Sequence, residues 1–240
     1  MPHTPRYNVV LAVGLVSTAG LGWIVGSWIG AGAAYPLTAA AFFAVLFAAL
    51  VRVAGAQHPY PRFGPANGVT TIRAMLAALA AGLVGHPAST AVLWSVIGLT
   101  ALMAALDGLD GRLARATRME SGYGARFDME TDAAFILVLS ALVWQHEKAG
   151  VWVLGCGLMR YAFVAGRWML PWLAQPLRAT RRGRSVAVLQ LLGLGVALGP
   201  IVPRPASAAV AGVTLAVLAW SFAIDVAWLW RQSVVRSVRL

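Results

Sequence analysis

Apolar residues along this chain gather in long continuous runs, separated by short segments rich in polar residues, proline and glycine. Eight runs stand out, at about 8–29, 34–52, 68–85, 88–106, 132–146, 149–170, 185–202 and 207–230. Most have close to the roughly 20 residues that a helix needs to cross the apolar core of a bilayer. Helix-breaking residues punctuate the pattern, as at Pro36, Pro87 and the glycine-rich 108–124 segment. The pattern predicts an all-α integral membrane protein with about eight transmembrane helices.

Composition agrees with this prediction and excludes several classes of protein. Of the 240 residues, 60% are hydrophobic and only 11% are charged, and the mean hydropathy is +0.74, which is not the composition of a soluble domain. The apolar runs are continuous and not alternating, which argues against a transmembrane β-barrel. The single cysteine, Cys156, lies in an apolar run, so a disulfide framework and a cysteine metal site are excluded.

Positive charge dominates, with 19 basic residues, 18 of them arginine, against eight acidic ones. Such an excess also occurs in nucleic-acid-binding proteins, but its placement here favours anionic membrane lipids as partners and no nucleic acid. One set of alternate loops holds only Lys148 and Arg204. The other set, with the termini, receives Arg6, Arg52, Arg62, Arg112, Arg115, Arg118, Arg126, the arginines of 178–184, Arg231, Arg236 and Arg239. This asymmetry predicts a multi-pass protein of the plasma (inner) membrane with both termini in the cytoplasm.

The acidic residues are concentrated in one short part of the chain. Six of the eight fall between positions 107 and 132. Asp107 and Asp110 are spaced i, i+3, and Asp128 and Asp132 are spaced i, i+4, so each pair lies on one face of a helix. Four carboxylates that converge from two helix ends beside a membrane would repel one another strongly. Bound divalent cations would resolve that conflict.

The residues between the two acidic pairs suit a phosphate ligand. Oxygen ligands without histidine or cysteine favour Mg²⁺ or Mn²⁺ over zinc, and two such ions can clamp a diphosphate. Gly111 and Gly124 let a ligand approach the backbone, and Arg115 offers a planar fork for phosphate oxygens. A loop of mixed charge with capping aspartates is the alternative, but capping does not explain two same-face pairs.

The motif Asp107-x2-Asp110-Gly111-x2-Ala114-Arg115-x8-Gly124-x3-Asp128-x3-Asp132 resembles the signature of the CDP-alcohol phosphotransferase (CDP-alcohol phosphatidyltransferase class I) family. A weaker resemblance lies upstream, where Asn67-x2-Thr70-x2-Arg73 is similar to the motif on the first core helix of that family. The resemblance implies a six-helix core over residues 67–232. Residues 1–66 would then hold an added pair of helices with a cytoplasmic linker, and 233–240 a basic cytoplasmic tail.

The resemblance also implies a reaction: transfer of a phosphatidyl group from CDP-diacylglycerol to an alcohol, with release of CMP, at the cytoplasmic face. Two divalent ions would be bridged by Asp107 and Asp128, with Asp110 on one ion and Asp132 on the other. Asp132 is also the general base by resemblance. The positions that would hold the CDP donor are Asn67, Thr70, Arg73, Gly111, Ala114, Arg115, Ser121 and Gly124.

The signature identifies the donor and not the acceptor. Arg160 and Arg167 are seven residues apart, hence on roughly one helix face, and Arg181, Arg182 and Arg184 form a second basic group. Such a lining suits an acceptor that carries its own phosphate, such as glycerol 3-phosphate or inositol phosphate. Attraction of lipid headgroups is the competing interpretation, above all for the second group.

Three other functions stay open as alternatives. A transferase of the CDP-choline or CDP-ethanolamine type would use diacylglycerol as acceptor. An intramembrane prenyltransferase would need a second acidic motif, and the second half of the chain offers only Glu147 and Asp225. A transporter would show inverted repeats and charges at the membrane midplane, and neither pattern is evident. The resemblance is also compatible with a homodimer.

Overall fold

The computed structural model describes residues 7–54, 60, 63–175 and 180–237, with the backbone alone at 53–54 and 234–237. Throughout these residues the regular structure is helical, which confirms the predicted all-α class. The arginines at positions 6, 62, 178 and 239, which entered the prediction of orientation, lie outside the described residues.

Each of the eight predicted runs contains one long helix. The elements are α1 (Tyr7–Ile29), α2 (Ala34–Ala54), α3 (Pro65–Gly82), α4 (Thr90–Leu106), α5 (Leu109–Thr117), α6 (Gly122–Gln145), the 3₁₀ helix η1 (Val151–Leu154), α7 (Gly155–Met169), the 3₁₀ helix η2 (Pro171–Ala174), α8 (Arg181–Ala197) and α9 (Arg204–Ser237).

The glycine-rich 108–124 segment, interpreted from the sequence as an interruption, is largely helical. Gly108 adopts a left-handed conformation with φ of 76°, which ends α4 and lets the chain start again as α5. The side chain of Ser121 then caps α6, which begins ten residues before the apolar run that predicted this helix. Hydropathy did not reveal these turns because they are polar and lie where the acidic pairs are.

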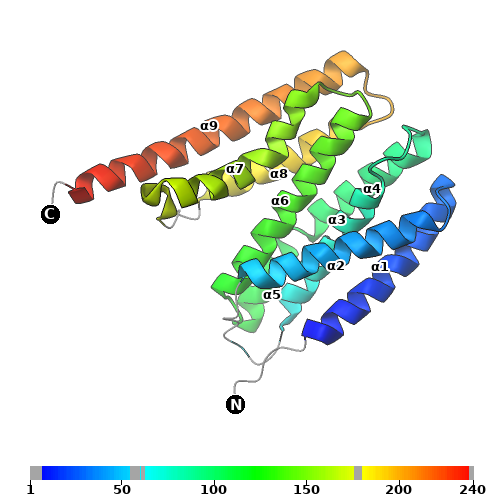
Figure 1. Ribbon diagram of the computed structural model, residues 1–240, viewed down its shortest axis with the longest axis horizontal. Coiled ribbons are helices and arrows are strands. Elements are labelled where there is room, and N and C mark those ends of the chain that lie inside the picture. Colours follow the sequence, from blue (N-terminus) through cyan, green and yellow to red (C-terminus); the bar gives the residue numbers. More distant parts are fainter. Residues whose placement is uncertain (1–6, 55–59, 61–62, 176–179, 238–240) are drawn as a thin grey trace.

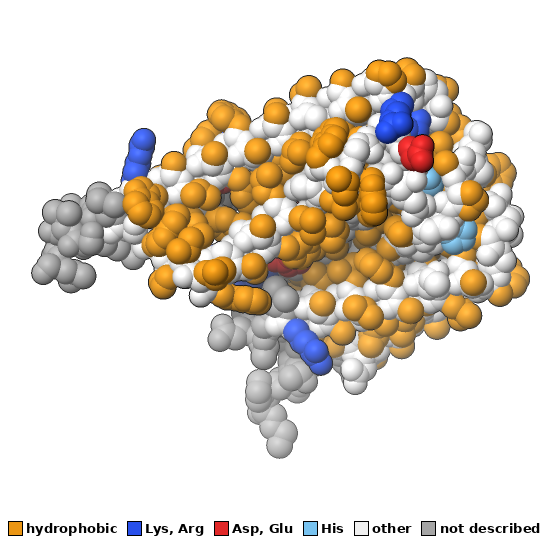
Figure 2. Space-filling model, turned by 45° about the horizontal axis from the view of Figure 1, so that its top comes forward, with side chains coloured by type: hydrophobic (Ala, Val, Ile, Leu, Met, Phe, Trp, Pro, Cys, Tyr) orange, Lys and Arg blue, Asp and Glu red, His pale blue; other side chains and the backbone are white. Residues whose placement is uncertain are grey.

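Four helical segments are long and apolar enough to cross a membrane: Tyr7–Ile29, Ala34–Arg52, Thr90–Thr117 and Arg204–Ser233. Figure 2 agrees, since hydrophobic side chains are spread over the whole visible face and charged side chains are few there. The other four predicted spans carry charged residues or are short. For example, α7 has 15 residues and contains Arg160 and Arg167, and α8 begins with two arginines. The composition of the four helices is that of a membrane protein.

The helices alternate in direction, and α3 and α6 lie in the middle of the arrangement (Figure 1). The α1–α2 hairpin covers one side of α3 and α6, and α8 and α9 pack together on another. The turns after α1, α3, α6 and α8 gather at one end, away from the two chain termini. The main core includes Leu79, Phe135, Leu139 and Leu194, all buried. This packing fixes α3 against α6, the two helices that matter for the site.

Gly157 reveals how closely α7 approaches α6. A Cβ at this position would lie 2.4 Å from the Cα of Leu137, so the backbone itself would have to move. We expect Gly157→Ala to cost about 1–3 kcal/mol of stability, measured as a lower Tm in detergent. Gly155→Ala is the matched control, because its Cβ would meet Leu215 at an ordinary 3.6 Å. Equal Tm values for the two variants would contradict this close packing.

Candidate functional site

The four predicted aspartates come from three consecutive helices. Asp107 is the C-cap residue of α4 and has an extended backbone. After the turn at Gly108, Asp110 lies in the first turn of α5. Asp128 and Asp132 lie one turn apart in the first half of α6. Because α3 packs against both α5 and α6, the two acidic pairs meet over the face of α3.

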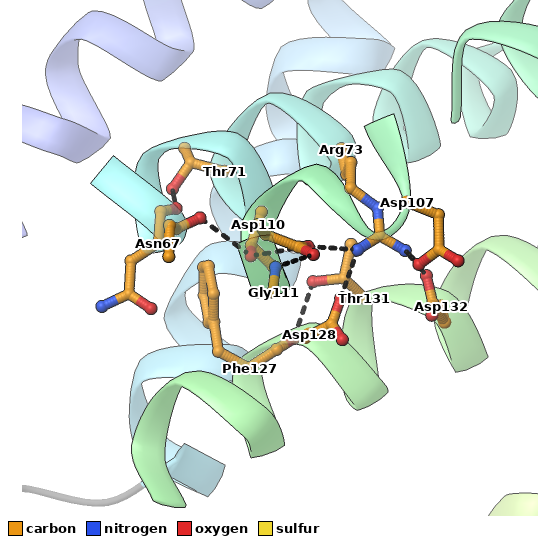
Figure 3. A network of polar contacts seen from close by, with 12 residues as sticks. Asn67, Thr71, Arg73, Asp107, Asp110, Gly111, Phe127, Asp128, Thr131 and Asp132 are labelled. Atoms are coloured by element: carbon orange, nitrogen blue, oxygen red, sulfur yellow. Dashed lines mark hydrogen bonds and ion pairs between the residues drawn. The ribbon is translucent and has the colours of Figure 1, made fainter. Parts of the chain in front are cut away.

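The guanidinium of Arg73, from α3, lies at the centre of this cluster (Figure 3). Its Nη1 donates to Asp110 at 2.5 Å and also to Asp128. Its Nη2 donates to Asp107 at 3.1 Å and also to Asp132. The Arg73 side chain is 1% exposed, whereas that of Asp128 is 36% exposed. The cluster is therefore buried on the side of α3 and accessible on the side of the carboxylates.

The donor set fits a divalent cation. One carboxylate oxygen from each of Asp107, Asp110 and Asp128 can be chosen so that all lie within 4.8 Å of one another. Such an all-oxygen group matches the ligands that Mg²⁺ and Mn²⁺ prefer. A single arginine against four carboxylates also leaves excess negative charge if all four are ionised. Asp132 is not one of the three grouped residues, but it contacts the same guanidinium nitrogen as Asp107.

Electrostatic strain appears at Asp128, which precedes the apolar run of α6. The pKa of this carboxyl is raised to about 6, because burial and the nearby charges of Asp110 and Asp107 raise it by more than the guanidinium of Arg73 lowers it. Burial and the two neighbouring carboxylates therefore disfavour the ionised form of Asp128 by more than Arg73 favours it. An added cation would favour the ionised form.

The upstream motif lies on the face of α3 that meets the aspartates. Thr70 Oγ1 donates to Asp110 at 3.4 Å and to the carbonyl of Ala66 at 3.2 Å. Asn67 Nδ2 donates to the carbonyl of Phe63 at 2.5 Å. The spacing of three residues places Asn67, Thr70 and Arg73 on one face of α3, and Thr70 and Arg73 contact the aspartates directly.

The remaining positions of the signature surround the turn between α5 and α6. Ser121 Oγ accepts from the Gly124 amide at 3.0 Å, so its role in this structure is to cap α6. A Cβ on Gly124 would lie 3.1 Å from Asn67 Oδ1, so glycine permits the close approach of α6 to α3. The Gly111 amide donates to Asp110 at 2.7 Å. Arg115 is exposed, and its Nη1 lies 3.5 Å from where a Cβ of Gly111 would be.

One further signature position has a backbone contact. Ala114 is half-buried, and its carbonyl accepts from the amide of Met119 at 3.0 Å, which helps to end α5.

The two arginines predicted to bind the acceptor contact other groups. Arg160 of α7 pairs with Glu130 of α6, and both side chains are about one-fifth exposed. Arg167 is exposed and donates to the carbonyl of Ala174 at 3.0 Å. The prediction had assigned no role to Glu130. The sequence feature that could have indicated this pair is Glu130 itself, because an acidic residue within a membrane helix needs a basic partner on a neighbouring helix.

Comparison with protein families gives a match to the model described as CDP-alcohol phosphatidyltransferase, over residues 63–227. The match begins just before α3 and ends within α9. It includes every position of both motifs and leaves α1 and α2 outside. The comparisons with curated proteins and with solved structures found no match.

Proposed function

The chain belongs to the CDP-alcohol phosphatidyltransferase family, which transfers substituted phosphate groups, and on that premise we propose that it moves a phosphatidyl group from CDP-diacylglycerol to an alcohol. CMP would be released. The observation that carries the proposal is the convergence of Asp107, Asp110, Asp128 and Asp132 around Arg73. We place this site at the cytoplasmic face of the plasma (inner) membrane, in a protein whose eight long helices all span the bilayer.

Two divalent ions, Mg²⁺ or Mn²⁺, would be held by these aspartates. Asp107 and Asp128 would bridge the ions, with Asp110 on one ion and Asp132 on the other. When bound, the ions would offset negative charge on the diphosphate and on the departing CMP. The short distances among oxygens of Asp107, Asp110 and Asp128 support a cation site on these three residues.

The residues of the chain itself would bind the donor and move one proton. The acceptor oxygen forms a bond to the phosphorus that carries the diacylglycerol, and the bond from that phosphorus to the oxygen of CMP breaks. Asp132 accepts the proton of the acceptor hydroxyl, and CMP leaves with the bonding electron pair. The cytidine diphosphate would be held by Asn67, Thr70, Arg73, Gly111, Ala114, Arg115, Ser121 and Gly124.

We propose an acceptor that carries a phosphate, such as glycerol 3-phosphate or inositol phosphate. The exposed side chain of Arg167 supports this, because its guanidinium makes one contact, to the carbonyl of Ala174, and has further N–H groups that could donate to a phosphate. Arg160 could bind such a phosphate only by sharing or exchanging its contact with Glu130. A homodimer and the division at residue 67 stay predictions.

A direct assay tests the proposed reaction. Purified protein would receive CDP-diacylglycerol and Mg²⁺ with glycerol 3-phosphate, inositol phosphate, serine or inositol, and CMP release would be followed with an EDTA control. Mg²⁺-dependent release with a phosphorylated acceptor supports the full proposal. Release only from CDP-choline or CDP-ethanolamine with diacylglycerol would overturn the assigned donor, and no release with any pair would overturn the proposed activity.

The role of Asp132 can be separated from that of the other carboxylates. We expect Asp132→Asn to lower CMP release by about 10²–10⁴-fold, the usual contribution of a general base, and to retain binding of CDP measured by calorimetry. Asp225→Asn is the matched control, since Asp225 also pairs with an arginine and is 28% exposed against 25% for Asp132. Near-normal turnover of Asp132→Asn would show that the base is another group.

A further inference from the structure

The segment before residue 63 lies outside the matched family range, yet it packs against the back of the site. In Figure 1, α2 crosses α6 and lies beside α3, on the side of the molecule where α5 is found. Contacts join α2 to both α3 and α6. The helices that carry Arg73 and Asp128 are therefore in contact with a hairpin that the family model does not include.

An aromatic cluster makes this contact. Phe43 and Phe47 of α2 and Tyr123 and Phe127 of α6 are all at most 3% exposed, and we call these four residues the aromatic brace. The rings of Phe47 and Phe127 meet edge-on, with centroids 6.2 Å apart. Tyr123 stacks on Phe127 at 6.0 Å, and Phe43 on Phe47 at 5.7 Å. Edge-on and offset arrangements of this kind are favourable and have defined geometry.

The brace is adjacent to the site along both helices. Phe127 directly precedes Asp128 on α6, and Ala74 and Met75, which follow Arg73 on α3, pack in the same buried cluster. Asp128 is partly exposed and pairs with Arg73 of α3. The apolar contacts behind it hold α6 against α3, and so help to keep Asp128 beside the other carboxylates.

Two tyrosines extend the contact. Tyr7 of α1 packs its ring 6.2 Å from that of Tyr123. Tyr60, in the linker before α3, donates to the carbonyl of Glu120 at 3.1 Å. That carbonyl lies in the turn between α5 and α6, next to the cap residue Ser121. The N-terminal segment thus contacts both the start of α6 and the turn that leads into it.

We propose that the α1–α2 hairpin is a positioning element of the metal site, and that Phe47 is the positioning residue that holds Asp128 in place for a divalent cation. This inference rests on the proposed function, because it assumes that the four aspartates bind metal. Groups that hydrogen-bond to metal ligands typically cost about 10–100-fold in metal affinity or activity when they are lost. Phe47 acts one step further away, through Phe127, so we expect an effect at the lower end of this range.

The hairpin has a second attachment, far from the brace, that supplies a control. Tyr35 at the start of α2 donates its hydroxyl to the carbonyl of Leu79 at 2.7 Å, and the contact is buried. Leu79 lies near the end of α3, whereas Arg73 lies at its middle, nearly two turns earlier. Tyr35→Phe therefore removes a hydrogen bond between α2 and α3 and leaves the four rings of the aromatic brace unchanged.

The test measures metal binding and not turnover. Mn²⁺ binding to the purified chain in detergent would be followed by the electron paramagnetic resonance signal of free Mn²⁺, and Tm would be recorded for each variant. We expect Phe47→Ala to weaken Mn²⁺ binding by about tenfold or more, with Phe47→Leu between this variant and the unaltered chain. Phe42→Ala removes a ring that is 36% exposed on the same helix and should bind Mn²⁺ normally.

Three outcomes would contradict the inference, and each has a distinct meaning. Unchanged Mn²⁺ affinity in Phe47→Ala, when the unaltered chain binds Mn²⁺, would overturn the positioning role alone. Equal weakening in Tyr35→Phe and Phe47→Ala would show a general loss of stability in place of positioning. No Mn²⁺ binding by the unaltered chain would overturn the proposed metal site itself, and the positioning role with it.

Discussion

Asp128→Asn is expected to lower CMP release by at least about a thousandfold, equivalent to about 4 kcal/mol in the barrier, which is within what metal ions contribute to phosphoryl transfer. Asp128 is one of three residues whose oxygens group within 4.8 Å, and it is the proposed bridge between two ions. An amide cannot replace a carboxylate there without losing charge and one ligand oxygen. Mn²⁺ binding should fall together with turnover.

The matched control, Glu147→Gln, removes a carboxylate just beyond the C-terminal end of α6, far along the helix from Asp128. Glu147→Gln changes the charge by the same amount just after α6, on an exposed side chain, and should leave turnover and Mn²⁺ binding unchanged. In EDTA, the Tm of Asp128→Asn should be no lower than that of the unaltered chain, because the variant has lost one of four carboxylates that repel one another. Retention of more than about a tenth of the turnover, against the thousandfold loss expected from metal catalysis, would remove Asp128 from the site.

The fold was predictable where hydropathy alone decides the structure. Long apolar runs form helices in a bilayer because every backbone polar group must be satisfied within the segment. Each of the eight runs holds a helix, and four helical segments are long and apolar enough to cross a membrane. The pattern did not predict α5 or the early start of α6. Those turns depend on a left-handed Gly108 and on the cap by Ser121, which are local features without an apolar period.

The candidate site was predictable in its residues and not in its internal contacts. Spacing placed Asp107 with Asp110 and Asp128 with Asp132, and the structure brings the two pairs together. Sequence could not show which cation compensates them within the chain, because that depends on how α3 packs on α5 and α6. The same holds for Phe47, whose helix is apolar on all sides and so offers no signal of which ring faces Phe127.

Arg73 carries the second large expected effect, on stability. It contacts all four aspartates while its own side chain is 1% exposed. Removal of one partner from a buried ion pair costs about 3–5 kcal/mol, and the partial exposure of the carboxylates places Arg73→Gln at the lower end, about 3 kcal/mol. We expect a clear fall of Tm in EDTA, and a smaller fall at saturating Mg²⁺ because cations then compensate the carboxylates.

The control for this variant is Arg182→Gln. Arg182 pairs with Asp225 between α8 and α9, with both side chains about one-quarter exposed, so its loss should cost at most about 1 kcal/mol. Equal Tm differences for Arg73→Gln in EDTA and in Mg²⁺ would show that Arg73 and metal do not compensate the same charges. In that case the main role of Arg73 would be to bind the donor, as the upstream motif implies. The Michaelis constant of Arg73→Gln for CDP-diacylglycerol would then rise, while its loss of stability would not depend on Mg²⁺.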